Sequence, residues 1–170
     1  CRMLGAPHGS DVNLGDLEGR RGLLLGRAKD NNESASLGPF IRLLDDRFTR
    51  KDIRNADLSL EVTGTDGYVL SGSSTMRVIS RDPEDLAQQM FDCHQYPDGA
   101  VLYTGTLFAP TDDRDRPGEG FTHKLGDVVR IASSRLGCLE NVVGRSDALP
   151  EWEDGALALF RSLSKRGIAI

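Results

Sequence analysis

A short, glycine-rich stretch near the start of the chain, GSDVNLGDLEGR (residues 9–20), contains three carboxylates, those of Asp11, Asp16 and Glu18. Carboxylate oxygens are the ligands that hard cations such as Mg²⁺ prefer, so the stretch can supply part of a metal site. The same residue types also occur in polar loops, where they cap turns and contact water. Two interpretations are therefore open: part of a metal site, or an ordinary loop.

Other chemical motifs are absent from the sequence. The chain has no GxxxxGK[ST] phosphate loop, no GxGxxG dinucleotide fingerprint and no GxSxG nucleophile turn. His8, His94 and His123 do not fall at metal-ligand spacing, so each is expected to be a surface or hydrogen-bonded structural residue. Cys93 and His94 are sequence neighbours and point in different directions in most local structures, which disfavours a cysteine nucleophile.

The composition describes a globular protein and limits its partners. The chain has 170 residues, of which 38% are hydrophobic and 28% charged, enough for one domain with a core. The formal net charge of −5 disfavours binding to nucleic acid, which needs a basic face. Three widely spaced cysteines predict no disulfide framework and fit a cytoplasmic setting. Apolar runs are too short for a membrane span.

Local patterns predict a β-rich α+β fold with two helices far apart in the chain. Alternating apolar residues predict a hairpin over 58–72 that turns at Asp66-Gly67. Asp82 and Pro83 predict the start of a helix over 82–93. A second helix is predicted near the C-terminus by residues at helical spacing, with a stop at Gly167: Trp152, Ala156, Leu159, Phe160 and Leu163.

Further strands are predicted over 38–44 and 100–110, the latter breaking into a turn at Thr104-Gly105-Thr106. DVVRIAS and CLENVV (residues 127–133 and 138–143) predict an antiparallel pair.

Four pieces of the sequence, taken in order, resemble one enzyme family. They are GSDVNLGD, AKDNNESASLGPFIRL, YTGTLFAP and HKLGDVVRIASSRLGCLENVV, which together span about Gly9 to Val143. In this order they resemble the catalytic C-terminal domain of the fumarylacetoacetate hydrolase superfamily. The last piece is the most specific, because the family closes its fold with Gly-Asp-Val-Val followed by Leu-Gly-x-Leu-x-Asn.

The resemblance implies a mixed β-roll, usually dimeric, that binds Mg²⁺, Mn²⁺ or Ca²⁺ and acts on 2-keto or 2,4-diketo acids as a hydrolase or lyase. It implies that Asp11 is a metal ligand and that Lys29 is the catalytic lysine, steadying negative charge on a substrate oxygen. It places Thr106, with Gly105, near the substrate carboxylate. A glycine there permits a tight bend in which N–H groups and a hydroxyl converge on an anion.

The chain departs from the family pattern at several points. Ser10 replaces the Asn that usually precedes the metal-ligating Asp, and Gly15 stands where the family has an Arg. The family's Glu-x-Glu metal pair and lid His precede the Asp, and they are not found in the ten residues before Asp11. The only Glu-x-Glu, Glu151-Trp152-Glu153, is in the wrong order and is expected to open the last helix. We therefore expect residues 1–170 to form a single, N-terminally incomplete domain or a degenerate copy.

Three hypotheses for the function follow. The first is a metal-dependent hydrolase or lyase that stabilises an enolate of a small 2-keto acid, in a cytoplasmic homodimer. The second is an inert relative that only folds and dimerises, and in which the metal is not retained. The third is an unrelated β-rich interaction domain.

Overall fold

The computed structural model describes residues 3–12, 25–106, 108 and 110–168. It divides into two compact units, each of which is described by itself. Unit 1 comprises Cys1–Val12 and Ala35–Val143, and unit 2 comprises Asn13–Ser34 and Gly144–Ile170. None of the described helices is long and apolar enough to cross a membrane.

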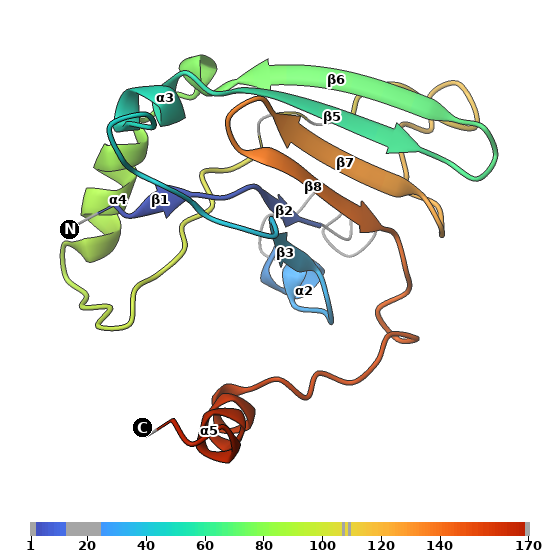
Figure 1. Cartoon of the computed structure of the whole chain (residues 1–170). Coiled ribbons are helices and arrows are strands. Elements are labelled where there is room, and N and C mark those ends of the chain that lie inside the picture. Colours follow the sequence, from blue (N-terminus) through green and yellow to red (C-terminus); the bar gives the residue numbers. More distant parts are fainter. Residues whose placement is uncertain (1–2, 13–24, 107, 109, 169–170) are drawn as a thin grey trace. The chain divides into compact units, whose positions relative to one another are not determined.

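A four-stranded antiparallel sheet is the largest element of unit 1 (Figure 1). Its strands are β5 (Asp57–Thr63), β6 (Val69–Thr75), β7 (Val128–Ser133) and β8 (Gly137–Val142), in the spatial order β6-β5-β7-β8. Val62 is opposite Leu70 on one side and Val129 on the other, so apolar side chains of neighbouring strands share one face. The predicted hairpin and the predicted antiparallel pair are both confirmed.

The β5–β6 turn forms where the sequence predicts it. The amide of Gly67 donates to the carbonyl of Gly64 at 3.1 Å, and Gly67 has a φ of +82°, a conformation that glycine adopts without strain. Asp66 accepts a hydrogen bond from the amide of Tyr68 at 3.2 Å. The Asp-Gly pair therefore fixes the register of the hairpin through local contacts.

Two short ladders in unit 1 join segments that are distant in the sequence. β1 (Gly5–Ala6) pairs with β4 (Arg42–Leu43), and β2 (Gly9–Asp11) pairs with β3 (Ala35–Leu37), both antiparallel. The strand predicted over 38–44 is thus mostly irregular, with only two of its residues in β4. Pro39 has no N–H to donate, which does not favour a long strand here.

The core of unit 1 lies where these ladders meet the helices. Phe48, Ile53 and Leu136 are buried in one cluster, and Met3, Ala6 and Leu44 pack against it. The Phe48 ring also faces the guanidinium groups of Arg42 and Arg135, at 5.0 and 5.7 Å from its centroid. The N-terminal strands are therefore anchored to the sheet through a small apolar core.

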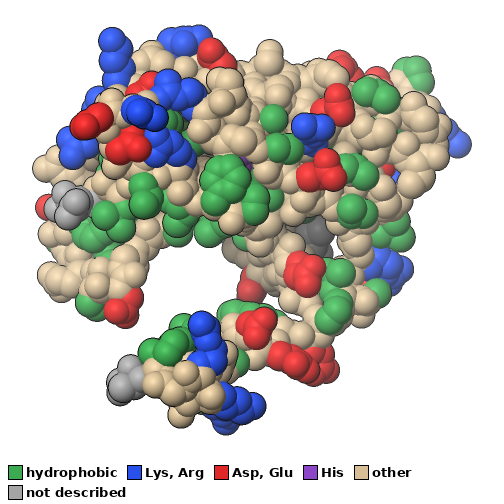
Figure 2. Space-filling model, in the orientation of Figure 1, with side chains coloured by type: hydrophobic (Ala, Val, Ile, Leu, Met, Phe, Trp, Pro, Cys, Tyr) green, Lys and Arg blue, Asp and Glu red, His purple; other side chains and the backbone are tan. Residues whose placement is uncertain are grey.

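Three helical segments of unit 1 lie at one end of the sheet: α3 (Arg50–Arg54), η2 (Met76–Val78) and α4 (Pro83–Phe91). Asp82 caps α4 by accepting from the Glu84 amide at 2.8 Å, as the sequence predicts. Arg54 binds the carboxylates of Asp82 and Glu84, and Arg50 lies 2.9 Å from Glu84. Figure 2 shows charged side chains of both signs gathered in the region of α3. The ion pairs therefore join α3 to the start of α4.

Unit 2 contains α2 (Leu25–Lys29) and α5 (Ala156–Lys165). The predicted C-terminal helix is confirmed, and Gly167 follows it with a φ of +71°. Glu151-Trp152-Glu153 does not open this helix, so that expectation is wrong. The N-cap is Gly155, and Trp152 is 81% exposed in the preceding loop.

The strand predicted over 100–110 is also wrong for its described residues. Residues 101–106 are irregular, and Val101, Leu102 and Tyr103 are exposed. Apolar, β-prone residues suit a strand, but these make no ladder with another described strand. The segment is instead anchored by aromatic side chains, as described below.

Candidate functional site

Asp11 is the last residue of β2 and is exposed. The register with β3 places Gly9 opposite Leu37, Ser10 opposite Ser36 and Asp11 opposite Ala35. Just before the strand, the carbonyl of His8 accepts a hydrogen bond from the amide of Gly38 at 2.7 Å. The backbone that carries Asp11 is therefore held by paired neighbours, while its carboxylate lies at the surface.

The Thr104-Gly105-Thr106 bend is present. Gly105 has a φ of +96°, and a Cβ atom built on it would meet no heavy atom within 4 Å. A side chain would fit at this position, so glycine is needed only because of the positive φ of the backbone. Thr106, directly after Gly105, is an exposed residue.

Tyr103 connects this bend to the strand that carries Asp11. Its ring lies directly on Gly9, where an added Cβ would be only 2.5 Å from Cε1 of the tyrosine. Its hydroxyl donates to the carbonyl of Ser36 at 3.1 Å, across the ladder from Ser10. Tyr103, which directly precedes the Thr104–Thr106 bend, therefore lies on the short ladder whose strand β2 ends at Asp11.

The electrostatics agree with this arrangement. Burial raises the pKa of the Tyr103 phenol above its ordinary value, and the negative charge of Asp11 raises it further. Both effects disfavour a phenolate, so the Tyr103 hydroxyl is a hydrogen-bond donor at neutral pH. Tyr103 was not singled out from the sequence, because no motif marks it beyond its place before Thr-Gly-Thr.

Lys29 lies in unit 2, at the last position of α2. A compact turn follows it, in which Ser34 Oγ donates to the Lys29 carbonyl at 2.7 Å and the Asp30 amide donates to the Gly26 carbonyl at 3.0 Å. Asn32 Nδ2 donates to the carbonyl of Pro150 at 3.0 Å, which ties the turn to the other segment of unit 2. These hydrogen bonds therefore hold the backbone around Lys29, the predicted catalytic lysine, in a defined conformation.

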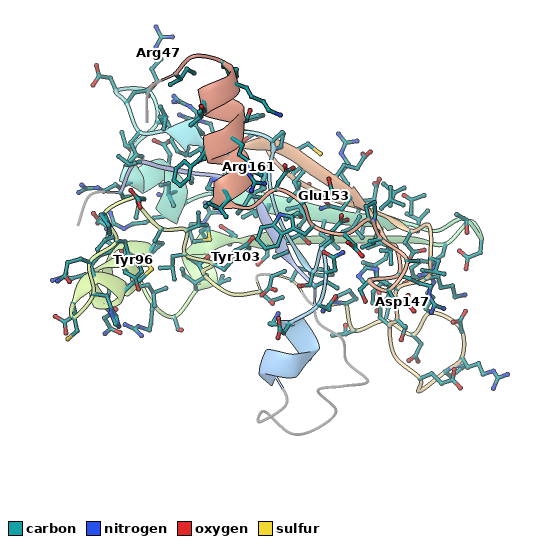
Figure 3. The ribbon with its side chains drawn as sticks, turned by 90° about the horizontal axis from the view of Figure 1, so that it is seen from below. Arg47, Tyr96, Tyr103, Asp147, Glu153 and Arg161 are labelled. Carbon is teal, nitrogen blue, oxygen red and sulfur yellow. The ribbon has the colours of Figure 1, made fainter. Side chains whose placement is uncertain are left out.

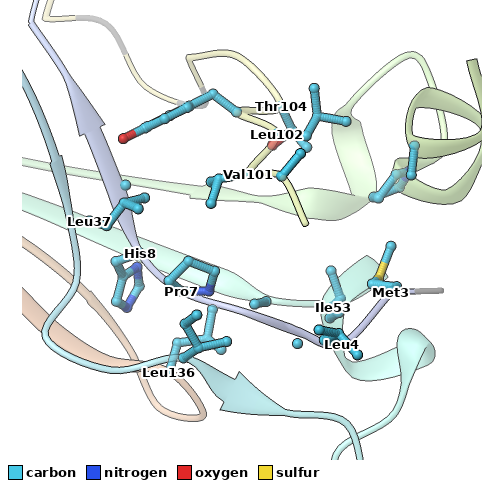
Figure 4. Close-up of a pocket in the computed structure, with 18 of the residues that line it drawn as sticks. Met3, Leu4, Pro7, His8, Leu37, Ile53, Val101, Leu102, Thr104 and Leu136 are labelled. Atoms are coloured by element: carbon cyan, nitrogen blue, oxygen red, sulfur yellow. The ribbon is translucent and has the colours of Figure 1, made fainter. Parts of the chain in front are cut away.

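An apolar cavity of about 350 Å³ lies within unit 1, between the segment 99–105 and the strand residues 3–9 (Figure 4). Its walls include Met3, Leu4, Ile53, Val101 and Leu102, and Thr104 and Gly105 also line it. None of its described lining residues is an aspartate or glutamate, so these residues do not resemble a site for a hard cation.

Two of the histidines in unit 1 are structural, as expected. His8 is 3% exposed, and its Nε2 lies 3.1 Å from the carbonyl of Gly137. Burial lowers the His8 pKa, and the Gly137 carbonyl only partly opposes this. His123 lies beside the buried Asp127, with Nδ1 at 3.6 Å from a carboxylate oxygen, and burial lowers its pKa as well.

The described residues do not by themselves form a magnesium site. Within the described part of the chain, no three His, Cys, Asp or Glu residues lie close enough to hold a metal ion. Asp11 has the right chemistry for one ligand, but Mg²⁺ usually needs more negative charge around it. Asp16 and Glu18, with Gly15, lie outside the described residues.

No family model matches the chain. Searches of known proteins and of solved structures both find dehydratases of the same kind. The chain is 28% identical over 138 residues to the 2-dehydro-3-deoxy-D-arabinonate dehydratase of Saccharolobus solfataricus, covering 81% of this chain and 43% of that enzyme.

A solved 2-keto-3-deoxy-D-arabinonate dehydratase, complexed with magnesium and 2,5-dioxopentanoate, matches with a TM-score of 0.69 and 30% identity. Its match covers 83% of this chain and 47% of that one. The apo form of the dehydratase matches with the same TM-score and identity, over 83% and 46% of the two chains. The chain thus spans less than half the length of the relatives that it matches.

Proposed function

We propose that this chain, a homologue of dehydratases in the fumarylacetoacetate hydrolase superfamily, contributes to a metal-dependent lyase site for small 2-keto acids. The homology confirms the resemblance drawn from the four sequence pieces. The solved relatives also confirm the β-rich α+β fold of that superfamily. An unrelated interaction domain is therefore excluded, and an inert relative is not favoured.

The observation that carries the proposal is the convergence at β2. The exposed Asp11 ends the β2–β3 ladder, and Tyr103, directly before the exposed Gly105-Thr106 of the bend, packs on the same ladder. A 2-keto acid has a carboxylate and a keto oxygen, which together chelate a hard cation. The site then needs one group that binds the cation and another that binds the remaining carboxylate oxygen of the substrate. In the proposal, Asp11 is the first and the Thr104–Thr106 bend is the second.

Each site residue has a distinct role in the proposal. Asp11 gives one oxygen to the cation, with further carboxylates coming from outside the described residues. The Thr106 hydroxyl and the N–H groups around Gly105 bind the substrate carboxylate. From the family resemblance alone, we assign to the ammonium of Lys29 the role of balancing negative charge as it develops on the substrate oxygen. The cation, when bound, favours the enolate form of the keto acid.

Dehydration is the reaction that we favour over hydrolysis. The relatives are dehydratases, and a 2-keto-3-deoxy acid has acidic C–H bonds next to its keto group. Removing a proton from C3 gives an enolate, and its electrons then expel the hydroxyl group from C4. The proton taken from C3 balances the charge of this hydroxyl group, so that the net loss is one water molecule. A single domain over 1–170, a homodimer and a cytoplasmic setting stay predictions.

Turnover of a 2-keto-3-deoxy sugar acid by the full chain with Mg²⁺ tests the proposal. Product is measured as the new carbonyl compound. Lys29→Gln should lower turnover by about 100-fold, since loss of one electrostatic group costs this much in comparable sites. Lys51→Gln changes an exposed lysine in α3 and should have no effect. Absence of turnover in the unmodified chain, or equal turnover in the Lys29 variant, would contradict the proposal.

A further inference from the structure

Two aromatic side chains of the described residues anchor the segment around 101–106: Tyr103 lies on the β2–β3 ladder, and Phe108, just beyond the segment, lies on Gly72 of β6. The segment joins none of the described ladders, and Val101, Leu102 and Tyr103 are 49%, 39% and 40% exposed. Gly105 adds a residue with wide conformational freedom directly before Thr106. A binding bend that joins none of the described ladders depends on side-chain anchors to keep a defined geometry.

Tyr103 makes two contacts that supply one of these anchors, and both are with the β2–β3 ladder. Its ring covers Gly9, with Cε1, Cδ1 and Cζ at 2.5, 3.1 and 3.3 Å from a Cβ built there. Its hydroxyl reaches the Ser36 carbonyl on the second strand at 3.1 Å. The side chain therefore spans both strands of the ladder.

The geometry of a strand relates these contacts to Asp11. Side chains two residues apart in a strand leave it on the same face. The ring of Tyr103 occupies the position of a Gly9 side chain, so Asp11 projects on the face that Tyr103 covers. The effect of the Asp11 charge on the phenol agrees with this.

We propose that Tyr103 is a positioning residue, which fixes the distance between the Asp11 carboxylate and the Thr104–Thr106 bend by clamping that bend onto the β2–β3 ladder. The inference rests on the proposed function, because it assigns these two groups to one site. Gly9 is the other half of the clamp, since any side chain at that position displaces the ring.

The first test is hydrogen exchange of backbone amides in the metal-free full chain. Tyr103→Phe removes only the hydroxyl, and we expect exchange at Gly9, Ser10 and Asp11 to become about three- to tenfold faster, the effect of one lost hydrogen bond. Tyr96→Phe is the matched control, because Tyr96 packs on Phe91 of α4, away from the ladder (Figure 3). It should leave these amides unchanged, and amides of β5–β8 should be unaffected in both variants.

Gly9→Ala tests the other half of the clamp. It should increase the exchange rates of the same amides more than Tyr103→Phe does, because the new Cβ clashes with the Tyr103 ring. In a Tyr103→Ala background, Gly9→Ala should have no further effect, since the ring it displaces is gone. Additive effects of the two changes would overturn the clamp.

A second measurement separates positioning from mere stability. Mn²⁺ added to the full chain should broaden the NMR signals of the Asp11 amide and the Thr106 methyl group. In Tyr103→Phe the broadening of the Thr106 methyl signal should fall to about half or less, because the bend is no longer held near the metal ion. The broadening of the Asp11 amide signal should persist. Equal broadening at Thr106 in both proteins would overturn the proposal.

The two measurements fail differently. If Mn²⁺ broadens neither signal in the unmodified chain, the proposed function fails, whereas the exchange rates still decide the role of Tyr103. If Tyr103→Phe and Tyr96→Phe give the same exchange at residues 9–11, Tyr103 is not a clamp, whatever the metal does.

Discussion

Two aspartates of unit 1, Asp127 and Asp11, occupy opposite kinds of environment. Asp127 is 0% exposed, and its carboxylate accepts hydrogen bonds from Arg114 Nη2 at 2.9 Å and from the Lys124 amide at 2.8 Å. Asp11 is exposed at the end of a three-residue strand. The first carboxylate is buried among its hydrogen-bond donors, and the second belongs to a surface residue.

The partners of Asp127 explain why a buried charge is tolerated. The Arg114 side chain is 2% exposed and binds Asp127 through two nitrogens, an arrangement that recovers much of the cost of burial. Arg114 also lies over the Tyr68 ring, at 4.6 Å from its centroid. The pair thus fastens the polar loop that carries Arg114 to the β5–β6 turn.

The comparison shows that a motif residue has to be assigned by its surroundings. Both aspartates belong to sequence pieces that carry the family resemblance, and both are flanked by glycine-containing stretches. Only the structure distinguishes a carboxylate that stabilises the fold from one that a ligand can reach.

The largest expected effect comes from Asp127→Asn. The change leaves the buried Arg114 with only the half-exposed Asp66 carboxylate, at 3.3 Å, as a counter-charge, so the free energy of unfolding should fall by about 3 kcal/mol. Urea denaturation followed by circular dichroism measures it. Asp11→Asn is the matched comparison, and it should stay within about 0.5 kcal/mol of the unmodified chain, as expected for a surface residue. Equal losses would abolish the distinction between the two aspartates.

A smaller effect is expected from Gly105→Ala. An L-residue at a φ of +96° is strained by about 1–2 kcal/mol, so the bend should rearrange and the affinity for pyruvate with Mg²⁺ should fall about tenfold. Gly67→Ala is the control, because Gly67 has a φ of +82° and is equally open to solvent. It should cost similar stability and leave pyruvate binding intact. Calorimetry and urea denaturation together separate the two outcomes.

The smallest expected effect concerns how the free energy of unfolding depends on acid pH, through the carboxyl groups of Asp66 and Asp127. The hydrogen bond from Lys124, followed by that from the Tyr68 amide, lowers the pKa of Asp66 to about 2, and Arg114 lowers the pKa of Asp127. A carboxyl whose pKa is lower in the folded state stabilises the fold above its ordinary pKa. That contribution is lost as the pH falls toward about 2.

Asp66→Asn should therefore make the loss of stability between about pH 4 and pH 2 shallower. Urea denaturation at a series of pH values measures the slope. The Asp46→Asn variant, which changes an exposed residue outside this network, should keep the original slope. An unchanged slope in the Asp66 variant would mean that its ion pairs do not contribute.

The elements that could be predicted from sequence are those fixed by local contacts. The β5–β6 hairpin has alternating apolar residues and an Asp-Gly turn, and α4 has its Asp82-Pro83 start, so each can be identified within a dozen residues. β1 and β2 pair with partners more than twenty residues away over only two or three positions, which leaves no periodic signal.

The same reasoning applies to the candidate site. Asp11, Lys29, Gly105 and Thr106 were named from motifs, and the positive φ of Gly105 agrees with the expected bend. Tyr103 was missed, because its role depends on contacts with Gly9 and Ser36, 94 and 67 positions away. The strand expected over 100–110 is wrong for its described residues for the same reason: Tyr103 and Phe108 pack on Gly9 and Gly72, which are distant in the sequence and leave no local pattern.

The most direct test of the account is a calorimetric titration of the full chain with Mg²⁺ in the presence of pyruvate. The account predicts measurable binding that Asp11→Asn weakens by about tenfold or more, since the loss of one charged ligand lowers affinity for a hard cation. Asp46→Asn should bind as the unmodified chain does. Binding that survives unchanged in the Asp11 variant, or no heat at millimolar Mg²⁺ in the unmodified chain, would contradict the claim that Asp11 is a metal ligand.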